Sequence, residues 1–363
     1  MKITYITNDI SGQGGLAHIL SIKTSLLIHK YGHEVTLIVS SALNETFYSF
    51  DPSVKIKQLP IPKNFSVYKL TYFKRLKKEI RQSTPNCVVI CDNGLKGYLT
   101  CFLRIPAPVI FECHSIDFVP FLLTGRKHLS LKRYFLKKLV DVALKQADKI
   151  VMLTESHANF LGFKNALIIP NPTWYIPKKK AVLQSNRAIA VGRLVKSKGF
   201  NRMIHAWKKI HSAYPHWSLD IYGEGNQKKH IKKLIDKYDL EDSIQLKGSA
   251  NNMEQIFPQY AFLIHTSFYE SFSLVIQQAM SFGLPAIAFD CPIGPRELIR
   301  HEQDGFLIEE YDNENFIKKT KLLIADTALR KSYGGKAFKA IKRYDLSEIM
   351  DTWNALFLST QKD

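Results

Sequence analysis

Two cationic side chains in the second half of the chain lie within a glycine-bounded turn and are well suited to hold an anion. The turn from Gly192 to Gly199 leaves a predicted strand, enters a predicted helix and contains Arg193 and Lys198. Arginine can bind a diphosphate through two parallel hydrogen bonds, and lysine supplies a mobile point charge. The segment therefore predicts either a diphosphate site or a basic loop exposed to solvent.

A carboxylate stands just after another predicted strand of the same half. Glu270 follows the strand that ends at His265, and it precedes a short loop and the start of a helix, formed by Ser271, Phe272, Ser273 and Leu274. The first N–H groups of a helix have no partner inside it, so they can bind an anion or hydroxyl oxygens. Glu270 can accept hydrogen bonds from sugar hydroxyls. This segment therefore predicts a site for an anion or a sugar.

A glycine-rich turn follows the first predicted strand. Gly12, Gly14 and Ala17 formally fit the G-x-G-x-x-G/A pattern of dinucleotide-binding proteins. A NAD site also needs an acidic residue roughly 20 positions further on, at the end of the second strand. That strand ends at Val39 and is followed by two serines. We interpret the turn as a loop that lets a phosphate or a sugar approach the backbone, with a plain tight turn as the alternative.

Short β-rich runs alternate with helical patterns along the chain, which predicts βαβ units and parallel sheets. We expect a helix over 200–214 and strands at 2–7, 34–39, 87–91, 109–113, 149–153, 166–169, 188–191, 218–222, 243–246, 262–265 and 285–289. Prolines and lysines between residues 170 and 180 interrupt the alternation, as a linker does. The sequence predicts an α/β protein with domains at 1–175 and 176–345. An amphipathic end helix over about 346–361 is expected to pack back on the first domain.

The composition excludes several classes of protein. Hydrophobic residues make up 45% and charged residues 23%, which is too apolar for a disordered chain. No apolar run approaches the roughly 18 residues of a membrane span, and the first residues lack a signal peptide's apolar stretch. Five cysteines without a repeated C-x-x-C spacing indicate reduced thiols, not a zinc site. We therefore expect a cytoplasmic protein without a metal.

The net charge of +19 is unevenly distributed. Residues 1–175 carry 23 basic and 11 acidic side chains, against 28 and 21 in the rest, so the first half is expected to meet an anionic partner. The stretch 126–149 predicts a basic amphipathic helix able to rest on an anionic membrane, or an ordinary surface helix. The basic runs 74–78 and 132–138 keep a polyanion-binding protein as an alternative. No base-reading motif is present, so nucleic acid is not an expected partner.

Taken together, the motifs resemble the donor site of glycosyltransferase family 4, which comprises retaining enzymes of the GT-B fold. The resemblance rests first on residues 192–199 and 270–285. It extends over most of the chain through the segments Gly14-Gly15, Tyr31-Gly32-His33-Glu34-Val35, Ile169-Pro170-Asn171, Ile221-Tyr222-Gly223-Glu224-Gly225, Gly294-Pro295-(x)-Glu297-Leu298-Ile299 and Asp304-Gly305-Phe306-Leu307-Ile308. The combined pattern is specific to the family, although no single motif is.

This resemblance implies two Rossmann-like domains that face each other across a cleft. It implies a retaining enzyme that moves a hexosyl or N-acetylhexosaminyl residue from a nucleotide-sugar, expected to be a UDP-sugar, to a glycan or lipid-linked acceptor. Synthesis of a cell-envelope polysaccharide, lipopolysaccharide or glycoconjugate is the implied setting. The basic first half of the chain allows a peripheral position on the inner face of the plasma membrane. The sequence contains no Asp-x-Asp, so we expect no metal and no other cofactor. In the family, the donor phosphate itself takes the acceptor proton during front-face attack.

The resemblance also assigns roles to residues. Arg193 and Lys198 correspond to the family's diphosphate-binding residues, and Glu270 with the backbone of 271–274 corresponds to the part that holds the donor sugar. The remaining matches are Gly14 and Gly15 at the diphosphate, Gly223 in the donor domain, and His114 near the reacting face of the sugar. Where the family has a second glutamate that binds the ribose, this chain has Gln278, which keeps an acceptor oxygen without the charge. A catalytically impaired family member therefore remains an alternative.

Overall fold

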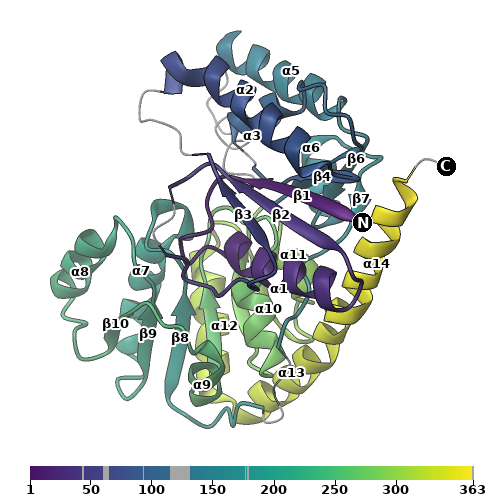
Figure 1. Ribbon diagram of the computed structural model, residues 1–363. Helices are drawn as coiled ribbons and strands as arrows, with labels where there is room; N and C mark the ends of the chain where they lie inside the picture. Colours follow the sequence, from purple (N-terminus) through teal and green to yellow (C-terminus); the bar gives the residue numbers. More distant parts are fainter. Residues whose placement is uncertain are drawn as a thin grey trace. The chain divides into compact units, whose positions relative to one another are not determined.

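The computed structural model describes residues 1–42, 45–59, 65–92, 94–114, 131–175, 177 and 180–361 (Figure 1). The chain divides into two compact units. Unit 1 joins residues 1–172 to residues 346–363, and unit 2 comprises residues 173–345. The first division falls at 172/173, whereas the boundary predicted from the sequence is 175/176. Thr173 already belongs to unit 2, because its N–H donates to the carbonyl of Tyr344 over 2.7 Å.

Unit 1 is built on one seven-stranded sheet in the order β3-β2-β1-β4-β5-β6-β7. Its strands are β1 (Lys2–Thr7), β2 (Glu34–Val39), β3 (Lys55–Gln58), β4 (Cys87–Ile90), β5 (Val109–Cys113), β6 (Lys149–Met152) and β7 (Leu167–Ile168). All pairings between these strands are parallel. The strand order reverses between β1 and β4, and in open α/β sheets ligands bind outside the carboxyl ends of the strands at such a point. The loops after β1 and β4 therefore flank the expected site, and the loop after the next strand, β5, lies beside them.

The helices of unit 1 are α1 (Gly15–His29), α2 (Phe65–Ser83), α3 (Leu95–Thr100), α5 (Leu131–Leu144), α6 (Glu155–Leu161) and α14 (Leu346–Ser359). Although α14 ends the chain, it packs on α1 near the N-terminus (Figure 1). Lys30 pairs with Asp351 over 2.8 Å, and Trp353 is buried. The apolar face of α14 is thus part of the core of unit 1.

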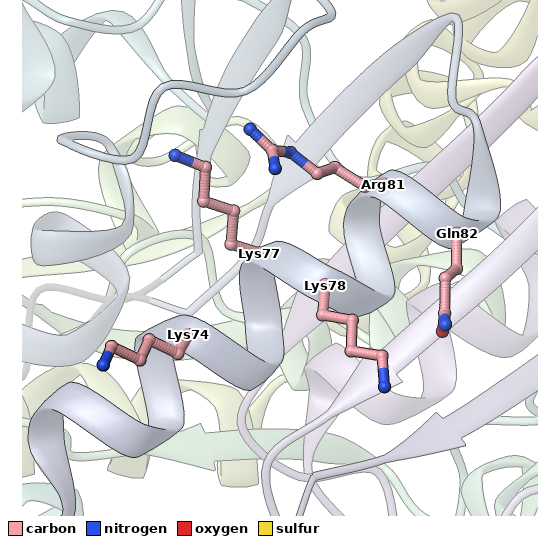
Figure 2. A pocket seen from close by; sticks show the side chains of 5 residues that line it. All are labelled: Lys74, Lys77, Lys78, Arg81 and Gln82. Carbon is pink, nitrogen blue, oxygen red and sulfur yellow. The ribbon is translucent and has the colours of Figure 1, made fainter.

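Helix α2 has one apolar face and one strongly basic face. Tyr72, Leu76 and Ile80 are buried against the sheet of unit 1. A hollow of about 360 Å³ on its outer side is lined by Lys74, Lys77, Lys78, Arg81 and Gln82 (Figure 2). The cations recur at intervals of three and four residues, so they share one face of the helix.

Unit 2 contains a second parallel sheet, of six strands in the order β10-β9-β8-β11-β12-β13. Its strands are β8 (Arg187–Val191), β9 (Ser218–Tyr222), β10 (Ile244–Gly248), β11 (Phe262–His265), β12 (Ala286–Asp290) and β13 (Gly305–Glu309). Its helices are η1 (Lys196–Lys198), α7 (Phe200–His211), α8 (Lys228–Lys237), α9 (Met253–Ile256), η2 (Phe257–Gln259), α10 (Leu274–Ser281), α11 (Pro295–Leu298), α12 (Asn313–Ala325), α13 (Thr327–Ala340) and η3 (Ile341–Tyr344). The order reverses between β8 and β11, so the loops after these two strands are neighbours.

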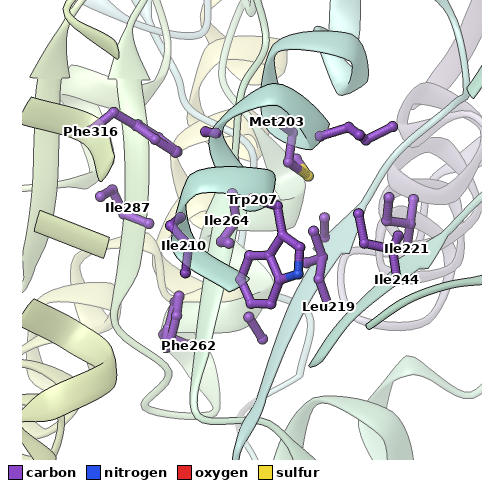
Figure 3. Packing of buried hydrophobic residues seen from close by; sticks show 14 of the residues in the cluster. Met203, Trp207, Ile210, Leu219, Ile221, Ile244, Phe262, Ile264, Ile287 and Phe316 are labelled. Atoms are coloured by element: carbon purple, nitrogen blue, oxygen red, sulfur yellow. The ribbon is translucent and has the colours of Figure 1, made fainter. Parts of the chain in front are cut away.

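The core of unit 2 fixes the strands whose ends carry the candidate residues. Trp207 of α7 is fully buried and lies in one apolar cluster with Leu219 of β9 and Phe262 of β11 (Figure 3). Phe289 stacks on Phe316 of α12 with ring centroids 4.4 Å apart. Burial of such large side chains is the main source of stability for the scaffold.

Two strands were not predicted from the sequence. β3 reads Lys-Ile-Lys-Gln, and as an edge strand it has mostly exposed side chains and no run of apolar residues. β13 begins at Gly305, and because glycine is uncommon in strands, the sequence there does not predict one. The neighbouring strand explains why this residue is a glycine, since a Cβ at Gly305 would lie 2.4 Å from the carbonyl oxygen of Ala286. Among the described residues, no helix is long and apolar enough to span a bilayer.

Candidate active site

A short ion pair joins two of the residues singled out from the sequence. Nζ of Lys198 lies 2.5 Å from Oε1 of Glu270. The same oxygen accepts a hydrogen bond from the Ser267 hydroxyl over 2.8 Å and lies 3.1 Å from Nε2 of His265. Burial alone would raise the pKa of Glu270, but Lys198 and His265 beside it hold that pKa well below the usual range. These neighbours therefore favour the ionised form of Glu270, which accepts hydrogen bonds.

Backbone contacts bring Lys198 to Glu270 across 72 residues of sequence. The N–H of Phe268 donates to the carbonyl of Ser197 over 2.8 Å, and the Thr266 hydroxyl donates to the carbonyl of Gly199 over 3.1 Å. Gly199 has φ +68°, and a Cβ there would lie 2.0 Å from the carbonyl oxygen of Thr266. Only glycine fits such a close approach, so it sets the distance between the two loops.

Arg202 holds the other side of the loop that carries Glu270. Its guanidinium donates to the carbonyls of Thr266 over 2.8 Å and Ser267 over 2.6 Å. It lies between the rings of Phe268 and Phe289, 4.0 and 4.1 Å from their centroids. The roles of Arg202, His265 and Ser267 were not predicted from the sequence. An arginine in the first turn of a helix gives no signal of the carbonyls it will meet.

Arg193 is placed differently from Lys198. Its side chain is exposed, and within the described part of the chain this side chain makes no hydrogen bond or ion pair. It follows Gly192, whose N–H donates to the carbonyl of Tyr222 over 2.9 Å. Gly223 packs on the same turn, since a Cβ there would lie 2.0 Å from the carbonyl oxygen of Gly192. The carboxyl ends of β8 and β9 are thus closely packed through Gly192 and Gly223. The Arg193 side chain beside them has no hydrogen bond or ion pair with the described residues.

The turn between Glu270 and α10 is strained. Ser273 has φ +67°, a left-handed conformation that costs a non-glycine residue roughly 1 kcal/mol. Its hydroxyl is buried without a partner among the described residues. Gly294, with φ +89°, packs against this turn, because a Cβ there would lie 2.9 Å from Cβ of Glu270 and 3.2 Å from the amide nitrogen of Phe272. The strained turn opens directly into Leu274, the first residue of α10.

The other residues predicted near this turn have different environments. Phe272 is buried, and its ring meets that of Tyr344 edge-on with centroids 5.4 Å apart. Ser271 is half-buried. Gln278 is half-buried on α10, whereas its neighbour Gln277 is fully buried. Phe272 therefore packs the turn against the interior of unit 2, while Ser271 and Gln278 retain exposed surface.

In unit 1, the turn after β1 ends in an uncapped helix N-terminus. Gly14 is the residue before α1, has extended backbone angles and provides no side-chain cap. A Cβ at Gly14 would meet nothing within 4 Å, so packing within the chain does not require a glycine there. Gly15 opens the 15-residue helix. The small residues leave room for a group that binds the first N–H groups of α1.

His114 follows β5 and lies against a buried carboxylate. Its Nε2 is 2.9 Å from Oε1 of Glu112, and Nζ of Lys23 is 2.6 Å from the same oxygen. Burial alone would raise the pKa of Glu112, but Lys23 and His114 hold it well below the usual range. His114 was a site residue predicted from the sequence, whereas Lys23 and Glu112 were not predicted. A lysine on the apolar side of α1 is the signal that points to a buried counter-charge.

This cluster also offers three atoms that a metal ion could use. Cys91, Glu112 and His114 each place one ligand atom within 4.8 Å of the others. The ammonium of Lys23 already supplies a cation to Glu112, and burial raises the pKa of the Cys91 thiol well above its usual value. A thiol must lose its proton to bind zinc. The donor set therefore suits an ion pair better than a metal.

Comparison with known proteins identifies relatives of this chain. The family model described as glycosyl transferases group 1 matches residues 174–340. The chain is 30% identical over 367 residues to the amylovoran biosynthesis glycosyltransferase AmsD of Erwinia amylovora, an alignment that covers 97% of this chain and 98% of that protein. The matched family region contains Lys198 and Glu270.

Solved structures show the same fold over the whole chain. Sucrose-phosphate synthase from Thermosynechococcus elongatus has a TM-score of 0.82 at 17% identity, covering 99% of this chain and 98% of that one. The pneumococcal O-GlcNAc transferase GtfA, solved with UDP and GlcNAc, has a TM-score of 0.79 at 14% identity, covering 100% and 99%. The expected GT-B class of fold, with two Rossmann-like parallel α/β domains, is confirmed.

The strained turn generates a stability prediction. We expect Ser273→Gly to stabilise the protein by about 1 kcal/mol, because glycine adopts the left-handed conformation without cost and removes a buried unpaired hydroxyl. Chemical denaturation of the full chain measures the change. Ser281→Gly, in the last turn of the same helix, is the matched control and should destabilise by about 1 kcal/mol. Equal losses in both variants would contradict the assigned strain.

Proposed function

The chain belongs to the glycosyl transferases group 1 family, and we propose that it transfers a hexosyl or N-acetylhexosaminyl residue from a UDP-sugar to a glycan or lipid-linked acceptor. We further propose that it is a retaining enzyme of glycosyltransferase family 4 that serves cell-envelope polysaccharide, lipopolysaccharide or glycoconjugate synthesis. The name of AmsD, a glycosyltransferase of amylovoran biosynthesis, supports polysaccharide synthesis. The UDP in the GtfA structure supports the donor class.

One observation carries the proposal: Lys198 and Glu270 meet beside the N-terminus of α10, at the carboxyl end of the sheet of unit 2. In the proposed mechanism, Lys198 and Arg193 neutralise the diphosphate as the bond to the sugar breaks. Fixed charges that face a leaving group stabilise the transition state without reorganisation. Glu270 and the backbone of residues 271–274 hold the hydroxyls of the sugar, and Gly223 belongs to the same donor-binding surface.

The state of Glu270 bears on the chemical step. A carboxylate engaged by Lys198, Ser267 and His265 is a poor nucleophile, because its charge and one of its oxygens are already used. This supports front-face attack, in which an oxygen of the donor phosphate takes the acceptor proton and the sugar keeps its anomeric configuration. Gly14 and Gly15 supply N–H groups to the diphosphate in this proposal, and His114 serves the reacting face of the sugar.

We predict that Arg193→Ala and Lys198→Ala each reduce turnover by roughly a hundredfold, because each removes a charge that faces the leaving group. Release of UDP from the UDP-sugar measures turnover. Lys196→Ala is the matched control, since Lys196 is an exposed cation of the same turn, and it should retain normal turnover. EDTA or added magnesium should change turnover by less than about twofold. Near-normal turnover in both active-site variants would contradict the proposed donor site.

We also predict that Gln278→Glu binds UDP about three- to tenfold more tightly, because a carboxylate accepts charge-assisted hydrogen bonds from both ribose hydroxyls. Gln278→Ala should bind UDP more weakly while remaining active. Calorimetry on the full chain measures these affinities, and Gln259→Glu, at an exposed glutamine of unit 2, controls for added charge. Identical UDP affinity in all variants would show that position 278 does not face the ribose. It would also remove the reason to consider a catalytically impaired enzyme, because that alternative rests on glutamine at position 278.

We propose that unit 1 rests on an anionic membrane, which places the enzyme peripherally on the inner face of the plasma membrane. Helix α5 buries Val140 and Leu144, yet its Tyr134 and Phe135 are 47% and 61% exposed. The exposed Lys137 and Lys138 lie on the same helix. Of the expected basic stretch 126–149, residues 126–130 lie outside the described residues. Exposed aromatic and basic side chains together favour the interface of an anionic bilayer.

Liposome co-sedimentation tests the membrane proposal. The wild type should pellet with anionic vesicles, less so as salt is raised, and Tyr134→Ser/Phe135→Ser should lower binding about tenfold by removing apolar side chains that enter the interface. Tyr311→Ser, at an exposed aromatic residue of unit 2, is the control. Equal pelleting of the wild type with neutral vesicles would contradict the proposal. A soluble polyanion would then be the remaining candidate ligand for the basic face of α2.

A further inference from the structure

The guanidinium group of Arg202 is enclosed on both faces of its plane. The Phe268 and Phe289 rings lie on either side of it, with centroids 4.0 and 4.1 Å away, and the Arg202 side chain is 11% exposed. An arginine that is largely withdrawn from water needs hydrogen-bond acceptors inside the protein. The two rings and these acceptors together hold the guanidinium in one position.

The acceptors are two successive backbone carbonyls of the loop that follows β11. Nε of Arg202 donates to the carbonyl of Thr266 over 2.8 Å, and Nη2 donates to that of Ser267 over 2.6 Å. β11 ends at His265, so both carbonyls lie just beyond the strand. The third nitrogen, Nη1, lies 4.0 Å from Oε1 of Glu310. Because the guanidinium is a rigid planar fork, it fixes the direction of two peptide groups at once.

These two loop residues also hold the Lys198–Glu270 pair through their side chains. The Ser267 hydroxyl donates to Oε1 of Glu270 over 2.8 Å. The Thr266 hydroxyl donates to the carbonyl of Gly199, the residue after Lys198. Arg202 itself has no ion pair or hydrogen bond with Glu270 in the part of the chain that the structure describes. It therefore acts on Glu270 through the backbone that carries Ser267.

A second buried arginine of unit 2 provides a comparison. Arg330 of α13 donates to the carbonyls of Leu183 over 3.0 Å and Ile324 over 2.9 Å. Its guanidinium lies 5.3 Å from the centroid of the Trp217 ring, and Trp217 directly precedes β9. Arg330 thus lies at the amino ends of the strands, whereas Arg202 binds the loop at the carboxyl end of β11. Both arginines tie carbonyls together, but only Arg202 does so beside Glu270.

We propose that Arg202 is a positioning residue for the donor sugar: by holding the carbonyls of Thr266 and Ser267, it fixes the place from which Glu270 accepts hydrogen bonds from the sugar. This inference rests on the proposed function, because it takes Glu270 to hold the sugar. A misplacement of about 1 Å in a group that orients a substrate can cost roughly a hundredfold in rate. Arg202 is thereby assigned to the reaction as well as to the fold.

Arg202→Met in the full chain tests the inference, because methionine fills the space between the rings but donates no hydrogen bond. We expect kcat/KM for UDP release from the UDP-sugar to fall about tenfold to a hundredfold, while affinity for UDP, which lacks the sugar, changes by less than about twofold. Arg202→Lys should restore little, because an ammonium group does not reproduce the planar fork. All proteins are assayed below their unfolding temperatures.

Arg330→Met is the matched control. It removes a buried arginine that also donates to carbonyls, so it should lower the unfolding temperature and leave kcat/KM unchanged. Ser267→Ala removes the link to Glu270 and keeps the buried arginine. It should lower kcat/KM about threefold to tenfold, the effect of one lost hydrogen bond. Wild-type kcat/KM in Ser267→Ala or in Arg202→Met would overturn the inference.

A double-variant cycle separates positioning from a general loss of structure. If Arg202 acts through Glu270, Arg202→Met should lower kcat/KM by less than about threefold when it is combined with Glu270→Gln. The same loss in both backgrounds, or an equal loss in Arg330→Met, would show a structural role alone and overturn the inference. Full kcat/KM in Glu270→Gln by itself would contradict the proposed function instead, which is a separate outcome.

Discussion

The ion pair between Lys198 and Glu270 sets the requirements for most of the residues around it. A carboxylate that is largely withdrawn from water is costly unless it is paired and hydrogen-bonded. Two loops that follow different strands must therefore be held at one fixed separation. Gly199 permits their close approach, and Arg202 ties the carbonyls of the second loop to α7. The strained turn at Ser273 then begins α10 directly beside the pair.

A similar arrangement of a carboxylate, a lysine and a histidine occurs in each unit. In unit 2, Oε1 of Glu270 lies near Lys198 and His265, and in unit 1, Oε1 of Glu112 lies near Lys23 and His114. The two differ in exposure. Lys198 is 21% exposed and can be reached from solvent, whereas Lys23 is 1% exposed and is closed to solvent. Of these two arrangements, the one in unit 2 is therefore the one that a ligand can reach.

The sequence predicted those parts of the fold and site that depend on local patterns. Continuous apolar runs identified the buried strands, and the motifs around Lys198 and Glu270 marked two loops that the structure brings into contact. The edge strand β3 was missed because Lys55 and Lys57 give it no apolar run. The contacts of Lys23 and His265 could not be predicted either. They depend on side chains brought together by the sheet, and 89 residues separate Lys23 from Glu112.

Mass spectrometry tests the central claim, that the Lys198–Glu270 site binds and activates a nucleotide-sugar. The full chain is incubated with a panel of UDP- and GDP-sugars, with water as the acceptor, beside its Glu270→Gln variant. The account predicts that the wild type releases UDP from a UDP-hexose or UDP-N-acetylhexosamine and that the variant does so at least about a hundredfold more slowly. Equal release by the two proteins, or no consumption of any nucleotide-sugar by the wild type, would contradict it.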